Sequence, residues 1–153
     1  MSNHAYVKRK KHFKIAEIEA AVREINARRF NSLFTIKAGP SVEVRYQYSN
    51  TNRDEVIQDF YVKKNRIIMP WPDGVWEVYI HIAFKHELGK MFDGWITDET
   101  DSEKTKSVPT PEKYYSLMAW LHIRHSNPMR KQAIDFDWIE HDLQYVPSDI
   151  KNL

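Results

Sequence analysis

Apolar residues recur at every third or fourth position between Phe13 and Arg29, and this spacing constrains the fold more than any other feature of the sequence. On a helix, residues three and four apart lie on the same face. The pattern therefore predicts an amphipathic helix over Phe13–Arg29 with one apolar stripe toward the core. Arg28 and Arg29 lie at its C-terminal end, where positive charge interacts favourably with the helix dipole. The stripe consists of Ile15, Ile18, Val22 and Ile25.

The hydrophobic period changes to two after this helix, which indicates a sheet. From Val42 to Tyr48, apolar and aromatic residues alternate with polar ones, as in a strand that buries one face. Shorter β-prone segments, separated by turn residues, lie at Leu33–Ala38, Asp59–Val62 and Ile67–Met69. Because the connections are short, we expect these strands to pair antiparallel as a meander.

The segment from Val75 to Phe84 fits two structures. As a strand it directs every second residue from Trp76 to Phe84 to a single face, and all of these residues are apolar. As a helix it carries apolar residues on two opposite sides and would have to be buried all round. We favour the strand, because such a helix is awkward in a small domain.

The remainder of the chain reads as a loop over Asp93–Thr110 and two helices. Each helix begins with Pro after a capping residue, one at Pro111 and one at Pro128. The fold class that we predict is therefore α+β: an N-terminal helix, a meander of four to five strands, and two C-terminal helices, with the helices on one face of the sheet. We expect a flexible basic arm over 1–12, one domain over 13–146 and a tail over 147–153.

Composition excludes several classes of site. The chain of 153 residues has no Cys, which excludes disulfides and thiolate metal sites. Its four Gly are too few for a Gly-rich nucleotide-binding loop, and no apolar run is long enough to span a bilayer. We expect a cytoplasmic protein without a membrane association.

The sharpest local motif is His86-Glu87-Leu88-Gly89-Lys90. With the four residues that follow, it resembles the active-site helix of zincin metallopeptidases, in which His-Glu-x-x-His places two zinc ligands one helical turn apart. The resemblance implies a zinc ligand at His86 and a general base at Glu87. Lys90 departs from the motif, since its ammonium group stands in place of the second His and repels Zn²⁺. We therefore expect no metal and no cofactor, and a structural role for His86 and Glu87 at a junction of sheet and helix.

Basic residues are concentrated in the first half of the chain. Residues 1–70 hold 14 Lys and Arg against 7 Asp and Glu, although the formal net charge of the whole chain is only +2. Basic arms and basic hairpin tips suit phosphate backbones, and Tyr6, Phe13 and Tyr61 can add base stacking. The candidate contact residues are Lys8, Arg9, Lys10, Lys11, Lys14, Arg28, Arg29, Arg45, Lys63, Lys64 and Arg66.

We therefore favour a small non-enzymatic binding or regulatory protein, of the accessory kind that phages also carry. Its basic half would contact nucleic acid or an acidic protein surface. Two alternatives stay open: a degenerate zincin-like hydrolase centred on His86 and Glu87, and a structural subunit of a homo-oligomer. The oligomer is suggested by Trp71, Trp76, Trp95 and Trp120, which exceed the needs of one small core.

Overall fold

A computed structural model describes residues 4–48, 52–72, 75–98, 101–106 and 146–151. The chain divides into two compact units, residues 1–109 and 110–153. The first unit holds the sheet and the long helices. In the second, the described part is a short helix, α5 (Ser148–Lys151), in the segment that we expected to be an irregular tail. The two C-terminal helices that we predict lie outside the described residues.

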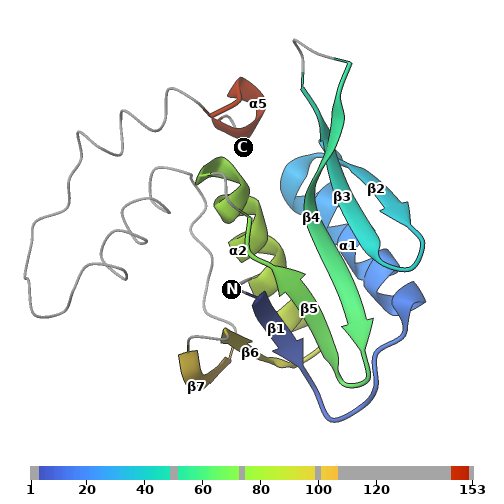
Figure 1. The fold of residues 1–153 in the computed structure, drawn as a ribbon, viewed down its shortest axis with the longest axis vertical. Helices are drawn as coiled ribbons and strands as arrows, with labels where there is room; N and C mark the ends of the chain where they lie inside the picture. The colour runs from blue at the N-terminus through green and yellow to red at the C-terminus, as the bar shows by residue number, and fades with distance from the viewer. Residues whose placement is uncertain (1–3, 49–51, 73–74, 99–100, 107–145, 152–153) are drawn as a thin grey trace, which may run out of the picture. The chain divides into compact units, whose positions relative to one another are not determined.

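Among the described residues, seven antiparallel strands form one sheet in the order β2-β3-β4-β5-β1-β6-β7 (Figure 1). The strands are β1 (His4–Lys8), β2 (Thr35–Ala38), β3 (Val42–Gln47), β4 (Asp54–Lys63), β5 (Arg66–Pro70), β6 (Trp95–Asp98) and β7 (Asp101–Lys106). With two long helices, α1 (Ile15–Phe30) and α2 (Val75–Met91), they make an α+β fold. The predicted fold class is confirmed, and β2 to β5 form the expected meander.

The N-terminal segment differs from our expectation. In place of a flexible arm, His4–Lys8 form β1, which pairs with β5 on one side and β6 on the other. Ala5 and Val7 are fully buried, so a short alternating pattern precedes the basic run. Strands β6 and β7 likewise form a hairpin within the segment that we predicted as a loop.

Helix α1 has nearly the predicted bounds and buries three of the four residues of the predicted stripe, while Ile15 is half-buried. Ile18, Val22 and Ile25 are fully inaccessible to solvent. The helix ends at Phe30 and is capped by Asn31, whose backbone is left-handed with φ of 50°, a conformation that Asn tolerates better than most residues.

The predicted strand over Val75–Phe84 is wrong, because this segment is the first part of helix α2. From Tyr79 to Gly89 every residue of α2 is buried, including Lys85, His86 and Glu87. A helix buried on all sides needs no polar face, and it satisfies its backbone hydrogen bonds internally. Burial has therefore overridden the β-propensity of its aromatic and branched residues. No helix among the described residues is long and apolar enough to cross a membrane.

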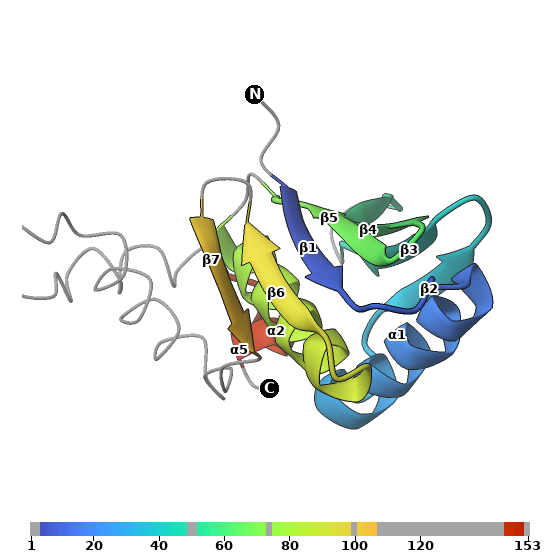
Figure 2. The same cartoon turned by 90° about the horizontal axis from the view of Figure 1, so that it is seen from below.

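Helices α1 and α2 lie on the same face of the sheet (Figure 2). In β1, Ala5 and Val7 point to this face, whereas Tyr6 and Lys8 point to the opposite one, which we call the outer face. Strand β6 approaches β1 closely at Gly94, where a Cβ atom would lie 2.7 Å from the carbonyl oxygen of Lys8. Gly94 thus allows the two strands to meet beside Lys8.

Candidate nucleic-acid interface

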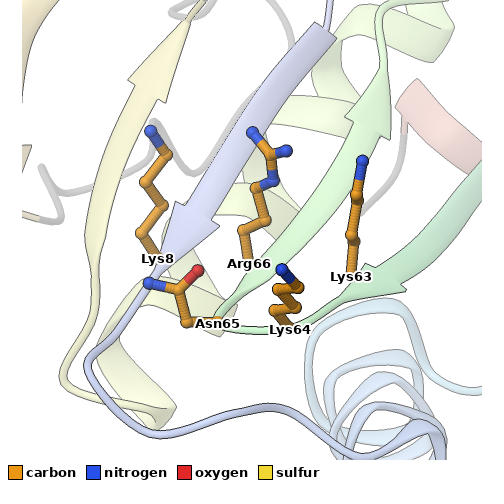
Figure 3. Close-up of a pocket in the computed structure, with 5 residues that line it drawn as sticks. All are labelled: Lys8, Lys63, Lys64, Asn65 and Arg66. Atoms are coloured by element: carbon orange, nitrogen blue, oxygen red, sulfur yellow. The ribbon is translucent and has the colours of Figure 1, made fainter.

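Four cationic side chains gather at one end of the outer face. Lys8 of β1, Lys63 of β4, Arg66 of β5 and Lys64 of the β4–β5 turn line a cavity of about 320 Å³ together with Asn65. Lys8, Arg66 and Lys63 extend side by side in the same direction from three neighbouring strands (Figure 3). We call Lys8, Lys63, Lys64 and Arg66 the cation cluster.

The sheet register explains why these residues meet. Arg66 is the partner of Lys8 in the β1–β5 pair and of Lys63 in the β4–β5 pair. Partners in an antiparallel pair point to the same face, so three cations lie in one row across three strands. Like charges in such positions repel one another, and this row therefore costs stability.

Backbone hydrogen bonds fix the turn that completes the cluster. The backbone N–H groups of Arg9 and Phe13 donate to the carbonyl oxygens of Asn65 and Lys64, at 3.0 and 2.7 Å. Lys64 adopts a left-handed conformation with φ of 54°, which costs a non-glycine residue about 1 kcal/mol. A strained, cationic residue is therefore held in place at the cavity.

Within the described part of the chain, the cation cluster has no carboxylate partner. None of its four side chains forms an ion pair or donates a hydrogen bond to a described residue. Lys8 and Arg66 instead lie over the ring of Tyr6, at 5.4 and 5.5 Å from its centroid. The charge of the cluster is thus available for an anionic ligand.

Arg9, a predicted contact residue, is held by contacts within the protein. Its guanidinium lies 3.9 Å from the ring centroid of Phe13 and forms a 2.8 Å ion pair with Glu17. It also donates to the carbonyl oxygens of Lys11 and His12. The backbone N–H of Lys14 and the nearby Arg9 together lower the pKa of Glu17. Phe13 is buried beneath Arg9, so almost none of its ring is exposed for the predicted base stacking.

Arg28 and Arg29 bind a carboxylate of the same protein. Both pair with Glu87, at 2.6 and 3.5 Å, and so join the end of α1 to α2. The hydrogen bond to Glu87 and its negative charge raise the pKa of Arg28. Two of the predicted contact residues therefore stabilise the helix pair.

Arg45 is similarly matched by acidic residues. It pairs with Glu43 at 3.0 Å and with Asp54 at 2.9 Å, and the hydrogen bond that it donates to Asp54 contributes most to raising its pKa. The predicted residues Lys10, Lys11 and Lys14 are exposed in the connection between β1 and α1. They flank the cation cluster in sequence but do not line its cavity.

The zincin-like motif does lie on a helix, as that interpretation requires. Its proposed general base, Glu87, is nevertheless occupied by Arg28 and Arg29. Across the described ranges, no three His, Asp or Glu side chains lie close enough together to hold a metal ion. The geometry supports a structural role for Glu87, but not at the junction of sheet and helix that we expected, because Glu87 lies inside α2 and joins it to α1.

A second buried polar group on α2 is His81. Its Nδ1 lies 2.7 Å from Oε1 of Gln58, and its ring lies 4.2 Å from that of Trp71. Burial, together with the neighbouring Lys85 and His86, places the pKa of His81 well below its ordinary value. This group belongs to the covered side of the sheet and makes no part of the cation cluster.

The sequence predicts all four cations as contact residues but not the two neighbours that share their face or their cavity. Asn65 lines the cavity, and its place inside the basic turn was the available signal. Trp95 is the β6 partner of Lys8, which puts it on the outer face beside the cluster. That position depends on β1 lying inside the sheet, which we did not predict because we interpreted residues 1–12 as a flexible basic arm.

Comparison of the chain with protein-family models, with curated proteins and with solved structures gives no match.

Proposed function

We propose that this protein is a non-enzymatic nucleic-acid-binding protein that holds phosphate groups in its cation cluster. One observation carries the proposal: eight of the predicted contact residues fall into two groups of four. Arg9, Arg28, Arg29 and Arg45 pair with carboxylates, whereas the cation cluster surrounds a cavity and has no carboxylate partner among the described residues.

The chemistry of the cluster fits a phosphate backbone. Successive phosphates offer regularly spaced negative charges, and each Lys or Arg that neutralises one releases a counterion. Arg66 can bind one phosphate in bidentate geometry, while lysine ammonium groups act as point charges on its neighbours. Asn65 lines the same cavity and adds an amide donor.

The cluster is also arranged before any ligand binds. Three of its residues are fixed by strand pairing, and the fourth by a turn that is hydrogen-bonded to the segment after β1. Repulsion within the row and the strained backbone at Lys64 both oppose folding. A bound polyanion would relieve the repulsion, which gives a physical reason for their presence.

The test is fluorescence polarisation of labelled oligonucleotides at two salt concentrations. A charge-reversed variant, Lys63→Glu, Lys64→Glu and Arg66→Glu, is compared with a control, Lys37→Glu, Arg53→Glu and Lys90→Glu, whose exposed positions lie elsewhere. Both variants change the net charge equally. We expect the cluster variant to lose affinity by about 100-fold or more and its salt slope to fall by about 2, since each single-strand phosphate contact contributes about 0.7.

Two outcomes would contradict the proposal. Equal losses in both variants would show that only net charge matters. Absence of binding by the natural protein at low salt would exclude nucleic acid and favour an acidic protein as the partner. Circular dichroism of both variants establishes that they are folded before binding is compared.

A further inference from the structure

The outer face carries a second row of residues parallel to the cations. Ile68 of β5 is the register partner of Tyr6 in β1 and of Tyr61 in β4. These three residues, Tyr6, Ile68 and Tyr61, form what we call the aromatic row. Each lies two positions along its strand from a member of the cation cluster: Lys8, Arg66 or Lys63.

We infer that the outer face binds single-stranded nucleic acid, with a base stacked on Tyr61 and the backbone phosphates on the cation cluster. This inference rests on the proposed function and specifies its ligand. Side chains two residues apart on a strand are about 7 Å apart, and neighbouring strands are about 4.8 Å apart. The distance between the two rows is therefore similar to the distance between a base and the phosphate group of the same nucleotide.

Tyr61 is the ring best placed to receive a base. Its side chain is exposed, with 45% of its surface accessible, whereas the ring of Tyr6 is flanked by Lys8 and Arg66. The hydroxyl of Tyr61 donates to Asp59 at 3.4 Å, which restrains the ring at its far end and leaves its faces free of that contact.

Charge along β4 sets the direction in which the bound nucleic-acid strand lies. Asp59 and its register partner Glu43 in β3 lie on the outer face beyond Tyr61, where Arg45 pairs with Glu43 and leaves Asp59 as the acidic neighbour of the ring. Lys63, on the other side of Tyr61, belongs to the cation cluster. A nucleotide is therefore repelled at one side of the ring and attracted at the other, which places its phosphate toward the β4–β5 turn.

A single strand fits this arrangement better than a duplex. Bases in a duplex are already stacked and paired, so a tyrosine on a flat sheet cannot reach their faces. An unpaired base can lie on an aromatic ring whatever its identity, because every base has a π-face. Duplex would contact the cation cluster alone.

The experiment measures three ligands against three proteins. The ligands are a labelled single strand, a duplex of equal charge, and an abasic strand that has the phosphodiester backbone without bases. The proteins are the natural chain, Tyr61→Phe, which keeps the ring, and Tyr61→Val, which removes the ring and suits a strand. We expect Tyr61→Val to weaken single-strand binding by between about 5-fold and 150-fold, and Tyr61→Phe to change it little.

The abasic strand separates stacking from charge. We expect the natural protein to bind it as weakly as Tyr61→Val binds the normal strand, and Tyr61→Val to bind both strands alike. Irradiation of a strand that contains 4-thiouridine should in addition attach it to the peptide containing Tyr61, as found by mass spectrometry.

Failure of this inference is distinguishable from failure of the proposed function. If duplex and abasic strand bind as tightly as the normal strand, and Tyr61→Val changes nothing, the phosphate site stands but base stacking is excluded. If the natural protein binds none of the three, both proposals fall. A crosslink confined to peptides distant from Tyr61 would also overturn the inference.

Discussion

The two groups of cations in this protein have opposite surroundings. Each arginine of the first group has a carboxylate within 3.5 Å, and the Glu87 pairs join α1 to α2. The cation cluster on the outer face instead places like charges side by side. The first group stabilises the fold, whereas the like charges of the second reduce its stability. Basic residues counted in a sequence thus do not reveal which of them a ligand can use; their carboxylate partners decide this.

Removal of Glu87 should give the largest effect on stability. Glu87→Gln leaves two arginines without their carboxylate, one of them, Arg29, largely buried. We expect the free energy of unfolding to fall by about 2–3 kcal/mol, below the range for fully buried pairs because Arg28 is half exposed. Urea unfolding measures this, with Arg28→Gln as a milder control. Nucleic-acid affinity should stay constant; a large loss of affinity would break the division into two groups.

Gly94→Ala should affect the stability of the fold and the binding of nucleic acid together. The added methyl group would meet the backbone of Lys8, a member of the cation cluster. We expect unfolding to become easier by about 1–2 kcal/mol and binding to weaken as well, because β1 must shift. Thermal unfolding and polarisation on the same sample measure both. An unchanged affinity would show that the position of Lys8 matters little.

Acidification should destabilise the covered side of the sheet through His81. Because its folded pKa lies below the unfolded value of about 6.5, the unfolded chain binds a proton that the folded chain does not. Its contribution to stability is full above about pH 6.5 and declines by about 1.4 kcal/mol per pH unit below that value. Urea unfolding at about pH 7.5 and about pH 5.5 should differ by about 1 kcal/mol on this account. In His81→Gln the difference should shrink; an equal difference would assign it to other groups.

Lys64→Gly should produce the smallest change, with opposite signs for stability and binding. Glycine adopts the left-handed conformation without strain, so unfolding should become harder by up to about 1 kcal/mol. One cation is lost, and affinity should fall a few-fold with a shallower salt slope. Lys64→Asn, which also tolerates this backbone, is the matched control for strain. If Lys64→Gly both stabilises the protein and binds equally well, Lys64 is no part of the interface.

The parts of the fold that depend on local patterns were predictable from the sequence. The stripe of α1, the alternation in β3 and the basic turn between β4 and β5 each follow from residues close together in the chain. Helix α2 was not predictable in this way, because its aromatic and branched residues suit a strand equally well. Only its burial on all sides, a property of the assembled fold, decides between the two.

The candidate site was predictable in composition but not in arrangement. Lys63, Lys64 and Arg66 lie within one turn, and the sequence places them together. Lys8 joins them only because β1 pairs with β5, and Arg28 is excluded only because Glu87 lies opposite it. Both facts concern residues more than fifty positions apart, and neither leaves a periodic signal.

The central position of β1 has a consequence for the order in which the chain folds. Strands β2 to β5 pair with their neighbours in sequence, so this meander can assemble from local contacts while synthesis continues. Strand β1 emerges first, yet both of its partners, β5 and β6, are translated long after it. Its docking closes the largest loops of the unit and should be the slow step. Until β6 is made, one edge of β1 has no partner strand, and nascent chains halted at that length should be the most prone to aggregate.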